Sequence, residues 1–519
     1  MLFINILMQK SQKVDIVLVT APYTEHYAPL PAIAILKSVA EKAGMSAKAI
    51  DLNQKYSKRI VDDLHRSQIV DWFLNETYHP EIENSVMKMF DNMADEIISH
   101  SPKIVGISVF TYANQIGAKY LAIAIRERDP TIKIIMGGQG LFDNVGGEGK
   151  YIEGLQEMKL LDNYFVNDAE QTFYKWLLGE KIEEGMHHKD WDKQIGSALT
   201  KMSFPSYDDH EFDHYREPII TITSSRGCVR KCKFCSDIVR WQKYQYRKGA
   251  EIFEEMRHQI KKYNIRKFYF TDPLINGNVK EFRVLINLIA RYNRMHPDAK
   301  ISYYAAFIFR PQNQFTPEDW QVLAESNPYR LQVGIESLDE DVRFHMGKKF
   351  NQADLEYGLD HCLKNNIYIE ANMIVGYPTE DQSSIDKQKK WLADNTKYQS
   401  ILEFGFGGTM MLLPGTYISV NQKEMGIQSW GPPYYLWTCE KSGSTPKKRI
   451  QWWKELMDAA KQHGWTVYNG IENNAIIDKM MALDMEQPLG NYTFEEGTRS
   501  VNLDQYKDEL KTQDSNFVA

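Results

Sequence analysis

The sequence predicts an α/β protein made of an N-terminal doubly wound parallel sheet, a partial or full (β/α) barrel, and a mainly helical, aromatic-rich C-terminal region. Strand-like and helix-like patterns alternate through most of the chain, which favours parallel sheets covered by helices. An irregular polar stretch at residues 181–219 interrupts this alternation and separates the two sheets. A length of 519 residues also requires more than one hydrophobic core.

The first domain is expected over residues 1–200. Residues 13–22, KVDIVLVTAP, are an apolar run typical of a buried strand, and the helical pattern that follows ends at Gly44. Further strands are predicted at residues 46–53, 103–110, 133–138 and 162–168, with helices between them. Residues 54–101 are charged and helical in pattern, so we expect them to be an insert.

The second domain is expected over residues 201–420, as a TIM-type barrel. A helical stripe at residues 249–263 and strands at 265–272, 301–307, 331–337 and 369–378 carry this prediction. The remaining residues, 421–519, form the third region, which is dense in aromatic residues.

The composition excludes several classes of protein. A net charge of −7 gives no sign of nucleic-acid binding, and no apolar run is long enough for a membrane span. The N-terminus lacks the cleavage site of a signal peptide. Five cysteines, three of them clustered, do not suit a secreted disulfide framework. We therefore expect a cytoplasmic protein in a reducing environment.

Residues 224–237, SSRGCVRKCKFCSD, place Cys228, Cys232 and Cys235 in a C-x3-C-x2-C pattern. Thiolates ligate iron–sulfur clusters, and a cubane cluster held by three thiolates leaves one iron open to another ligand. Structural zinc needs a fourth protein ligand, which only distant residues could supply: Cys362, His361 or Cys439. The spacing favours a 4Fe-4S cluster and leaves zinc and inert thiols as alternatives.

The stretch SRGCVRKCKFC resembles the signature of the radical S-adenosylmethionine (SAM) superfamily, in the branch with an N-terminal cobalamin (B12)-binding-type domain. Phe234 is the aromatic residue before the last cysteine. Later stretches are similar to further motifs of that branch: FYFTDPLINGN (268–278), LQVGIESLDEDVRFHMGKK (331–349), MIVGYPTED (373–381) and LLPGTYI (412–418). The resemblance implies that SAM binds the open iron and is cleaved reductively, giving a 5′-deoxyadenosyl radical that removes hydrogen from substrate.

The same resemblance implies that SAM contacts the ends of the barrel strands. The candidate SAM-binding residues are Phe234, Asp272, Asn276, Arg310, Glu336, Ser337 and Gly376. Glu336 suits a ribose hydroxyl or an ammonium group, and Arg310 suits the SAM carboxylate. Asp272 is a looser match, because the Gly-Gly-Glu form of the family motif is absent. A salt bridge at the barrel rim is the alternative role for each charged residue.

Residues 19–53 and 101–140 resemble the Rossmann-like cobalamin-binding domain of this branch. The resemblance implies cobalamin, with these residues near the corrin: Tyr23, His26, Gly137, Gly138 and Gln139. The Asp-x-His-x-x-Gly loop, whose His ligates cobalt, is missing, and a lone histidine such as His26 is more often an ordinary loop residue than a cobalt ligand. Some relatives keep this fold without the cofactor.

The leading hypothesis is a cobalamin-dependent radical SAM enzyme that methylates an unactivated carbon. One alternative is a radical SAM enzyme of oxidative, cyclising or rearranging chemistry that does not use cobalamin for methyl transfer. A non-enzymatic alternative is an iron–sulfur or corrin redox sensor. A methylthiotransferase is disfavoured, because residues 1–227 contain no cysteine for a second cluster.

The expected partners are an unknown small-molecule or peptide substrate and an electron donor such as flavodoxin or ferredoxin. Basic residues around the cysteines would attract an acidic donor, or they form an ordinary solvated face: Arg226, Arg230, Lys231, Lys233, Arg240, Lys243, Arg247 and Lys248. Aromatic residues of the third region line a substrate pocket, cover the corrin or pack in a core: Trp430, Tyr434, Tyr435, Trp437, Trp452 and Trp453. Cys362 and Cys439 are expected to be packing residues.

Overall fold

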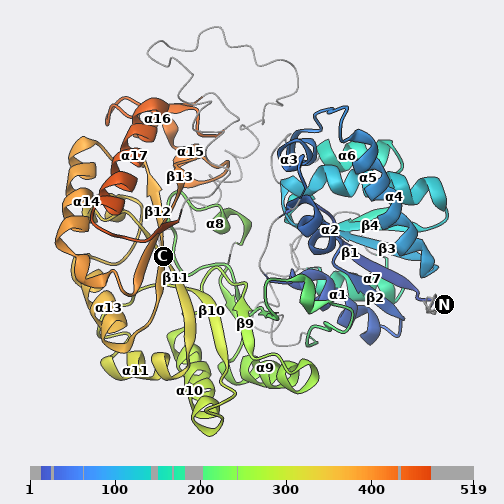
Figure 1. Cartoon of the computed structure of the whole chain (residues 1–519), viewed down its shortest axis with the longest axis horizontal. Coiled ribbons are helices and arrows are strands. Elements are labelled where there is room, and N and C mark those ends of the chain that lie inside the picture. Colours follow the sequence, from blue (N-terminus) through green and yellow to red (C-terminus); the bar gives the residue numbers. More distant parts are fainter. Residues whose placement is uncertain are drawn as a thin grey trace, which may run out of the picture. The chain divides into compact units, whose positions relative to one another are not determined.

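The computed structural model describes residues 13–24, 28–61, 63–141, 150–165, 169–181, 203–241, 243–429 and 434–468. The chain divides into two compact units, Met1–Thr221 and Ile222–Ala519 (Figure 1). The three-part division expected from the sequence stays a prediction.

The first unit contains a parallel five-stranded sheet with the strand order β2-β1-β3-β4-β5. Its strands are β1 (Ile16–Thr20), β2 (Ala47–Ile50), β3 (Ile104–Ser108), β4 (Lys133–Gly137) and β5 (Asn163–Phe165). Its helices are α1 (Pro31–Lys42), α2 (Leu52–Val61), α3 (Arg66–Asn75), α4 (Glu83–Ser99), α5 (Gln115–Arg128), α6 (Lys150–Glu157) and α7 (Glu170–Leu177). The chain reverses its winding direction between β1 and β3, which makes this pair the topological switch point.

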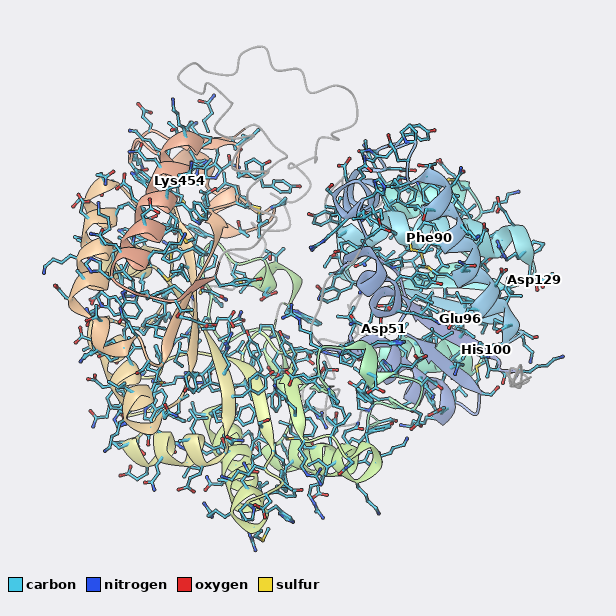
Figure 2. All side chains as sticks on the ribbon, viewed as in Figure 1. Asp51, Phe90, Glu96, His100, Asp129 and Lys454 are labelled. Carbon is cyan, nitrogen blue, oxygen red and sulfur yellow. The ribbon has the colours of Figure 1, made fainter. Side chains whose placement is uncertain are left out.

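Alternate residues of β1 enter two different cores, because successive side chains of a strand point to opposite faces. Ile16 and Leu18 pack with residues of α1 and α7, among them Phe173. Val17 and Val19 pack with residues of α3, α4 and α5, among them Phe90, which is labelled in Figure 2. The central strand is therefore buried on both faces, as the continuous apolar run IVLVT predicts.

The second unit contains a seven-stranded sheet with the order β16-β13-β12-β11-β10-β9-β6. Its strands are β6 (Ile220–Ile222), β9 (Lys267–Phe270), β10 (Ser302–Phe307), β11 (Pro328–Glu336), β12 (Ile369–Val375), β13 (Leu402–Thr409) and β16 (Val467–Tyr468). Among the described residues β6 and β16 are the end strands, so the structure shows a partial barrel.

Helices cover the outer side of this partial barrel (Figure 1). They are α9 (Gly249–Tyr263), α10 (Val279–Met295), α11 (Pro317–Glu325), α13 (Gln352–Asn365), α14 (Gln382–Asp394) and α17 (Pro446–Gln462). The unit also contains the short helices α8 (Asp237–Arg240), α12 (Glu340–His345), α15 (Tyr417–Val420) and α16 (Gln422–Met425). Two small hairpins complete the unit, β7 (Ser225–Arg226) with β8 (Gln245–Tyr246) and β14 (Ile427–Ser429) with β15 (Trp437–Cys439).

Two of the barrel strands, β10 and β12, are fully buried on one face only. Burial alternates strictly along β10 and β12, so that every second side chain packs under the helices and the others are partly exposed. Sequence signals define the helices outside: Thr316 and Asp319 form a capping box on α11, and Asn351 with Asp354 forms one on α13. Among the described residues, no helix is both long and apolar enough to cross a membrane.

The aromatic C-terminal residues are mostly core. Trp437, Trp452 and Trp453 are each at most 5% exposed, and the last two lie inside α17. Trp430 lies outside the described residues. Cys362 and Cys439 are buried, as expected of packing residues. Tyr434 and Tyr435 are partly exposed, and a substrate-lining role for them stays a prediction.

Candidate active site

Cys228, Cys232 and Cys235 lie on the loop between β7 and α8, and none of them forms a disulfide. Burial raises the pKa of all three thiols, that of Cys235 to about 12, and the thiolate charge of Cys228 raises the pKa of the other two. The three sulfurs are therefore close enough to repel one another when ionised. A bound metal group would supply the positive charge that such buried thiolates need.

The donor set fits a cluster better than a single metal ion. Among the described residues, no group of three or more His, Cys, Asp or Glu side chains has the geometry of ligands around one ion. A structural zinc site, which needs four ligands around one ion, therefore has no ligand set in this part of the chain. In a cubane cluster each thiolate binds a different iron, so the sulfurs need not converge on one point.

Asp272, just after β9, supports the turn that leads into the cysteine loop. One carboxylate oxygen accepts hydrogen bonds from the backbone N–H groups of Ser224 (2.7 Å) and Ser225 (2.8 Å), and the other accepts from the Ser224 hydroxyl. Burial raises the pKa of Asp272 to about 7, although these hydrogen bonds lower it. Its oxygens are engaged within the chain, so the structure gives Asp272 a supporting role, and its predicted contact with SAM stays a prediction.

The end of α12 packs against the cysteine loop. Gly347 has a φ of +82°, and a Cβ there would lie 3.1 Å from the carbonyl oxygen of Lys231. The Lys233 N–H donates to the carbonyl of Met346 at 2.9 Å. Gly347 was not singled out from the sequence, although the quoted stretch 331–349 contains it. Its lack of a side chain lets the loop approach the helix.

Glu336, at the end of β11, forms an ion pair with Lys348. The Lys348 ammonium donates to Glu336 Oε1 and to the Gly334 carbonyl, both at 2.8 Å, and lies 5.7 Å from the Phe234 ring centroid. Burial opposes the Lys348 charge, but Glu336 and Cys232 outweigh that effect and raise its pKa. Lys348 thus joins the strand end to the cysteine loop, a role that sequence reasoning missed.

Glu336 also has a φ of +68°, which is unusual for a residue with a side chain. Such left-handed conformations are enriched at functional sites, where the surrounding structure holds them. Here a β-bulge between Gly334 and Glu336 interrupts the pairing of β11 with β12. The bulge turns the Glu336 side chain toward Lys348.

Asn276 and Arg310 hold two loops together at the same end of the sheet. The Asn276 amide exchanges hydrogen bonds with Ile308, donating to its carbonyl at 2.9 Å and accepting from its N–H at 3.1 Å. Arg310 donates to the carbonyls of Asn276 (2.8 Å) and Gly277 (2.9 Å), and its buried Nε has no hydrogen-bond partner among the described residues. Burial lowers the pKa of Arg310. Arg310 therefore supports the loop at Asn276 and Gly277, and its predicted contact with the SAM carboxylate stays a prediction.

Ser337 and Gly376 lie on the loops after β11 and β12. Ser337 is fully buried, and its carbonyl accepts from Arg343 at 2.7 Å. Gly376 has a φ of +87°, and a Cβ there would lie 2.2 Å from the Cδ atom of Arg449. The structure thus brings Phe234, Glu336 and the cysteines together through Lys348, while Gly376 packs against α17.

The carboxyl edge of the first unit is held by two asparagines that sequence reasoning also missed. Asn53 accepts from the Thr24 N–H and donates to the Thr24 carbonyl, each at 2.7 Å. Asn114 accepts from the Thr24 hydroxyl at 2.9 Å and donates to the Ala21 carbonyl at 2.8 Å. Both are buried, and they fix the loop after β1 at the switch point.

The residues predicted to bind cobalamin differ in their burial and in their place in the first unit. Tyr23 is buried, and His26 lies outside the described residues. Gly137 ends β4, and Gln139 follows it. Gly138 has a φ of +111°, and a Cβ there would lie 2.3 Å from the Val109 carbonyl oxygen. Packing within the chain therefore already requires a glycine at 138.

Comparisons with known proteins agree with this geometry. The sequence model of the Radical SAM superfamily matches residues 222–392. An uncharacterized methyltransferase of Pyrococcus horikoshii is 22% identical over 357 residues, which is 66% of this chain and 72% of that protein.

Two solved structures share the fold. The radical SAM methyltransferase TsrM of Kitasatospora setae, solved with cobalamin and a [4Fe-4S] cluster, has a TM-score of 0.58 and 17% identity, covering 80% of each chain. The cobalamin-dependent SAM radical enzyme OxsB, solved with aqua-cobalamin and SAM, has a TM-score of 0.53 and 15% identity, covering 80% of this chain and 56% of OxsB. Residues 222–392, the part of the partial barrel that carries Cys228, Cys232 and Cys235, therefore match the radical SAM superfamily, and the chain shares the fold of these two solved structures.

Proposed function

We propose that this protein is a cobalamin-dependent radical SAM methyltransferase that acts on an unactivated carbon. The observation that carries the proposal is the presence, in one chain, of a three-cysteine loop on a parallel partial barrel and a separate doubly wound unit of flavodoxin-like strand order. TsrM and OxsB share this fold, and they were solved with cobalamin and aqua-cobalamin bound, respectively.

Cys228, Cys232 and Cys235 would hold the 4Fe-4S cluster. The cluster, when bound, supplies one electron that cleaves SAM into methionine and a 5′-deoxyadenosyl radical. Glu336 would accept a hydrogen bond from the ammonium or ribose of SAM, with Lys348 holding the carboxylate in place. Arg310 would take the SAM carboxylate through its unpartnered Nε.

The carboxyl edge of the first unit would hold cobalamin. Open α/β sheets bind ligands at the carboxyl ends of the strands beside the switch point. Phe110 and Tyr112, just after β3, are 41% and 47% exposed and offer an apolar surface that suits the face of a corrin. Asn114 holds their loop against the loop after β1. Cobalamin, when bound there, supplies a cobalt centre able to carry a methyl group.

The electron would come from an acidic partner such as flavodoxin or ferredoxin, in a reducing compartment. Lys231 is exposed beside Cys232, and Val229 is 41% exposed beside Cys228. A mixed basic and apolar surface of this kind suits a weak, fast-exchanging electron donor.

The test is anaerobic reconstitution with iron and sulfide, then with hydroxocobalamin, followed by incubation with SAM and a chemical reductant. We expect a corrin absorption spectrum that survives desalting, 5′-deoxyadenosine, and S-adenosylhomocysteine, the product left when SAM gives up its methyl group. Formation of 5′-deoxyadenosine without S-adenosylhomocysteine would instead support oxidative or cyclising chemistry. No SAM cleavage at all would overturn the enzyme proposal in favour of a sensor.

Matched variants separate the two cofactors. Cys228→Ala should abolish 5′-deoxyadenosine formation, whereas Cys362→Ala, a buried cysteine elsewhere in the barrel, should leave it unchanged. Phe110→Asp should weaken retention of hydroxocobalamin at least tenfold. Met158→Asp should not, since Met158 is also exposed but precedes β5, at the opposite edge of the sheet. Equal corrin retention by both variants would place the corrin elsewhere.

A further inference from the structure

Gln388 of α14 lies in an unbroken chain of hydrogen bonds between the loops that follow β11 and β12. Its side-chain oxygen accepts from the Leu338 N–H at 3.0 Å, and its Nε2 donates to Glu380 Oε1 at 2.6 Å. The other oxygen of Glu380 accepts from the Gly376 N–H. Gln388 is 1% exposed and Glu380 is fully buried.

The chemistry of the partners sets the direction of every bond in this chain. A backbone N–H can only donate, so Leu338 requires the oxygen of Gln388 on its side and turns the NH₂ group toward Glu380. Glu380 must then accept on both oxygens, from Gln388 and from Gly376. Burial raises the pKa of Glu380 to about 7, and the surrounding N–H donors favour its ionised form.

The two loops joined in this way carry candidate SAM-binding residues. Leu338 follows Glu336 and Ser337 directly, and Gly376 begins the loop after β12. The Gly376 backbone is held in a left-handed conformation, with a φ of +87°, while its N–H points to Glu380. A shift of Glu380 or Gln388 therefore moves the backbone at both candidate contacts.

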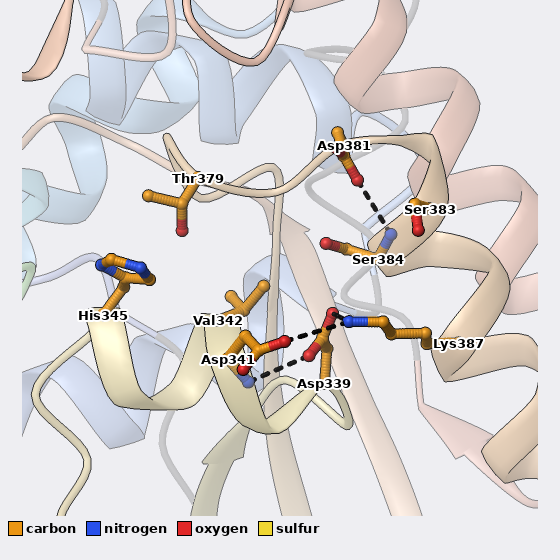
Figure 3. Close-up of a pocket in the computed structure, with 9 residues that line it drawn as sticks. All are labelled: Asp339, Asp341, Val342, His345, Thr379, Asp381, Ser383, Ser384 and Lys387. Carbon is orange, nitrogen blue, oxygen red and sulfur yellow. Dashed lines mark hydrogen bonds and ion pairs between the residues drawn. The ribbon is translucent and has the colours of Figure 1, made fainter.

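A second connection between the same loops is more exposed. Lys387, the neighbour of Gln388, pairs with Asp339 at 3.3 Å and Asp341 at 3.1 Å. Figure 3 shows these pairs beside a pocket of about 220 Å³ between α12 and α14. The Lys387 side chain is 53% exposed, and such half-exposed ion pairs contribute little. The buried Gln388 chain is therefore the stronger restraint.

We propose that Gln388 is a positioning residue for SAM: through Leu338 and Glu380 it holds the loops after β11 and β12 at the separation that SAM binding requires. This inference rests on the proposed placement of SAM at Glu336 and Gly376. It adds that Gln388 and Glu380, which are not themselves candidate SAM contacts, must present their hydrogen-bond donors and acceptors in the order described above.

An exchange of the two side chains tests the inference. In Glu380→Gln, the NH₂ group of the new amide can face the NH₂ group of Gln388. If the Gln388 amide turns over instead, its NH₂ group faces the Leu338 N–H. Two donors therefore face each other in either arrangement. In Gln388→Glu, two buried carboxylates meet. The double variant Glu380→Gln/Gln388→Glu restores every donor–acceptor pair. Its carboxylate at position 388 accepts from the Leu338 N–H and from the amide NH₂ at position 380, and the oxygen of that amide accepts from the Gly376 N–H.

The measurement is the dissociation constant of SAM for the reconstituted protein with its cluster oxidised, so that SAM is not consumed, with thermal unfolding in parallel. Each single variant should weaken SAM binding at least tenfold, and the double variant should come within threefold of the wild type. Lys387→Ala should change the affinity less than twofold. Gln259→Glu, which places a carboxylate at a fully buried glutamine of α9, should lower the unfolding temperature without weakening SAM binding.

Wild-type affinity in the single variants, or no recovery in the double variant, would overturn the positioning role. Loss of affinity that tracks the unfolding temperature across all variants, Gln259→Glu included, would do the same. Failure of the proposed SAM site is distinguishable, because the wild-type protein would then bind no SAM. Failure of methyl transfer alone would leave SAM binding, and therefore this test, unaffected.

Discussion

At the scale of single residues, the candidate site depends on small side chains as much as on charged ones. Gly334 lies between the Glu336 carboxylate and the Lys348 ammonium: an added Cβ would lie 2.3 Å from Glu336 Oε1 and 2.7 Å from Lys348 Nζ. The ion pair between Glu336 and Lys348 therefore requires a glycine at position 334. The sequence stretch GIES displays the glycine and the glutamate, but nothing in it identifies the lysine that both contact.

Gly334→Ala tests this requirement. The methyl group must displace the ion pair, at a cost of about 1–3 kcal/mol, so we expect lower SAM affinity and a cluster that is lost more readily. Iron content and SAM binding after reconstitution would measure it. Gly405→Ala is the control, since its Cβ would find ordinary contacts at 3.6 Å and beyond. Equal iron content and SAM affinity in Gly334→Ala and the wild type would contradict the argument.

The buried Glu380 makes a second prediction at this scale. Its pKa is raised from 4.5 to about 7, so between these values the folded state binds a proton that the unfolded state has released. Its contribution to the free energy of unfolding must therefore fall as pH rises from about 4.5 to 7, by on the order of a few kcal/mol.

Chemical denaturation of wild type and Glu380→Gln across this range measures that contribution. The free energy of unfolding of the wild type, relative to that of Glu380→Gln, should decrease as pH rises and become constant above about pH 8. A difference that is constant with pH would show that Glu380 keeps an ordinary pKa.

At the scale of elements, the segment before the barrel covers the free edge of the first sheet. Asp209 accepts from the Ala49 N–H of the edge strand β2 at 3.0 Å and from the Lys37 ammonium at 2.5 Å. Burial alone would raise the pKa of Asp209, but Lys37 and the Ala49 N–H outweigh it and lower the pKa. A paired edge strand is protected from pairing with another chain. From the sequence, this segment was only an irregular bridge.

Asp209→Ala should leave the Lys37 ammonium, at 5% side-chain exposure, buried without this partner. We expect a loss of about 3–5 kcal/mol in the free energy of unfolding of the first unit. Lys37→Met/Asp209→Ala, which removes both charges, should lose less than the single variant. Urea denaturation of the three proteins is the measurement, and a double variant that is less stable than Asp209→Ala would contradict this account of the ion pair.

At the scale of the whole molecule, the chain consists of two compact units, each with its own core. Units with separate cores unfold as separate cooperative transitions when little couples them. We therefore expect two transitions in calorimetry of the full chain. Asp209→Ala should lower the temperature of one transition and leave the other unchanged. A single transition that shifts as a whole would show strong coupling between the units.

Local patterns in the sequence were enough to predict the strands, most helices and both parallel sheets, and they identify three cysteines as candidate cluster ligands. These depend on hydrophobic period, capping residues and spacing, which are local properties of the chain. The helix predicted at residues 249–263 is α9 with the same bounds. Its apolar stripe and the left-handed Asn264 that caps its end are both local signals.

Which side chains act together depends on contacts between residues far apart in the chain. Lys348 meets Glu336 because a β-bulge and a left-handed residue turn the end of β11 toward it. Gln388 meets Leu338, 50 positions away, because parallel strands bring successive loops to one edge of the barrel. Asn114 reaches Ala21 across 93 positions because β1 and β3 are neighbours at the switch point. Such pairs arise from strand order and register, which no local pattern in the chain encodes.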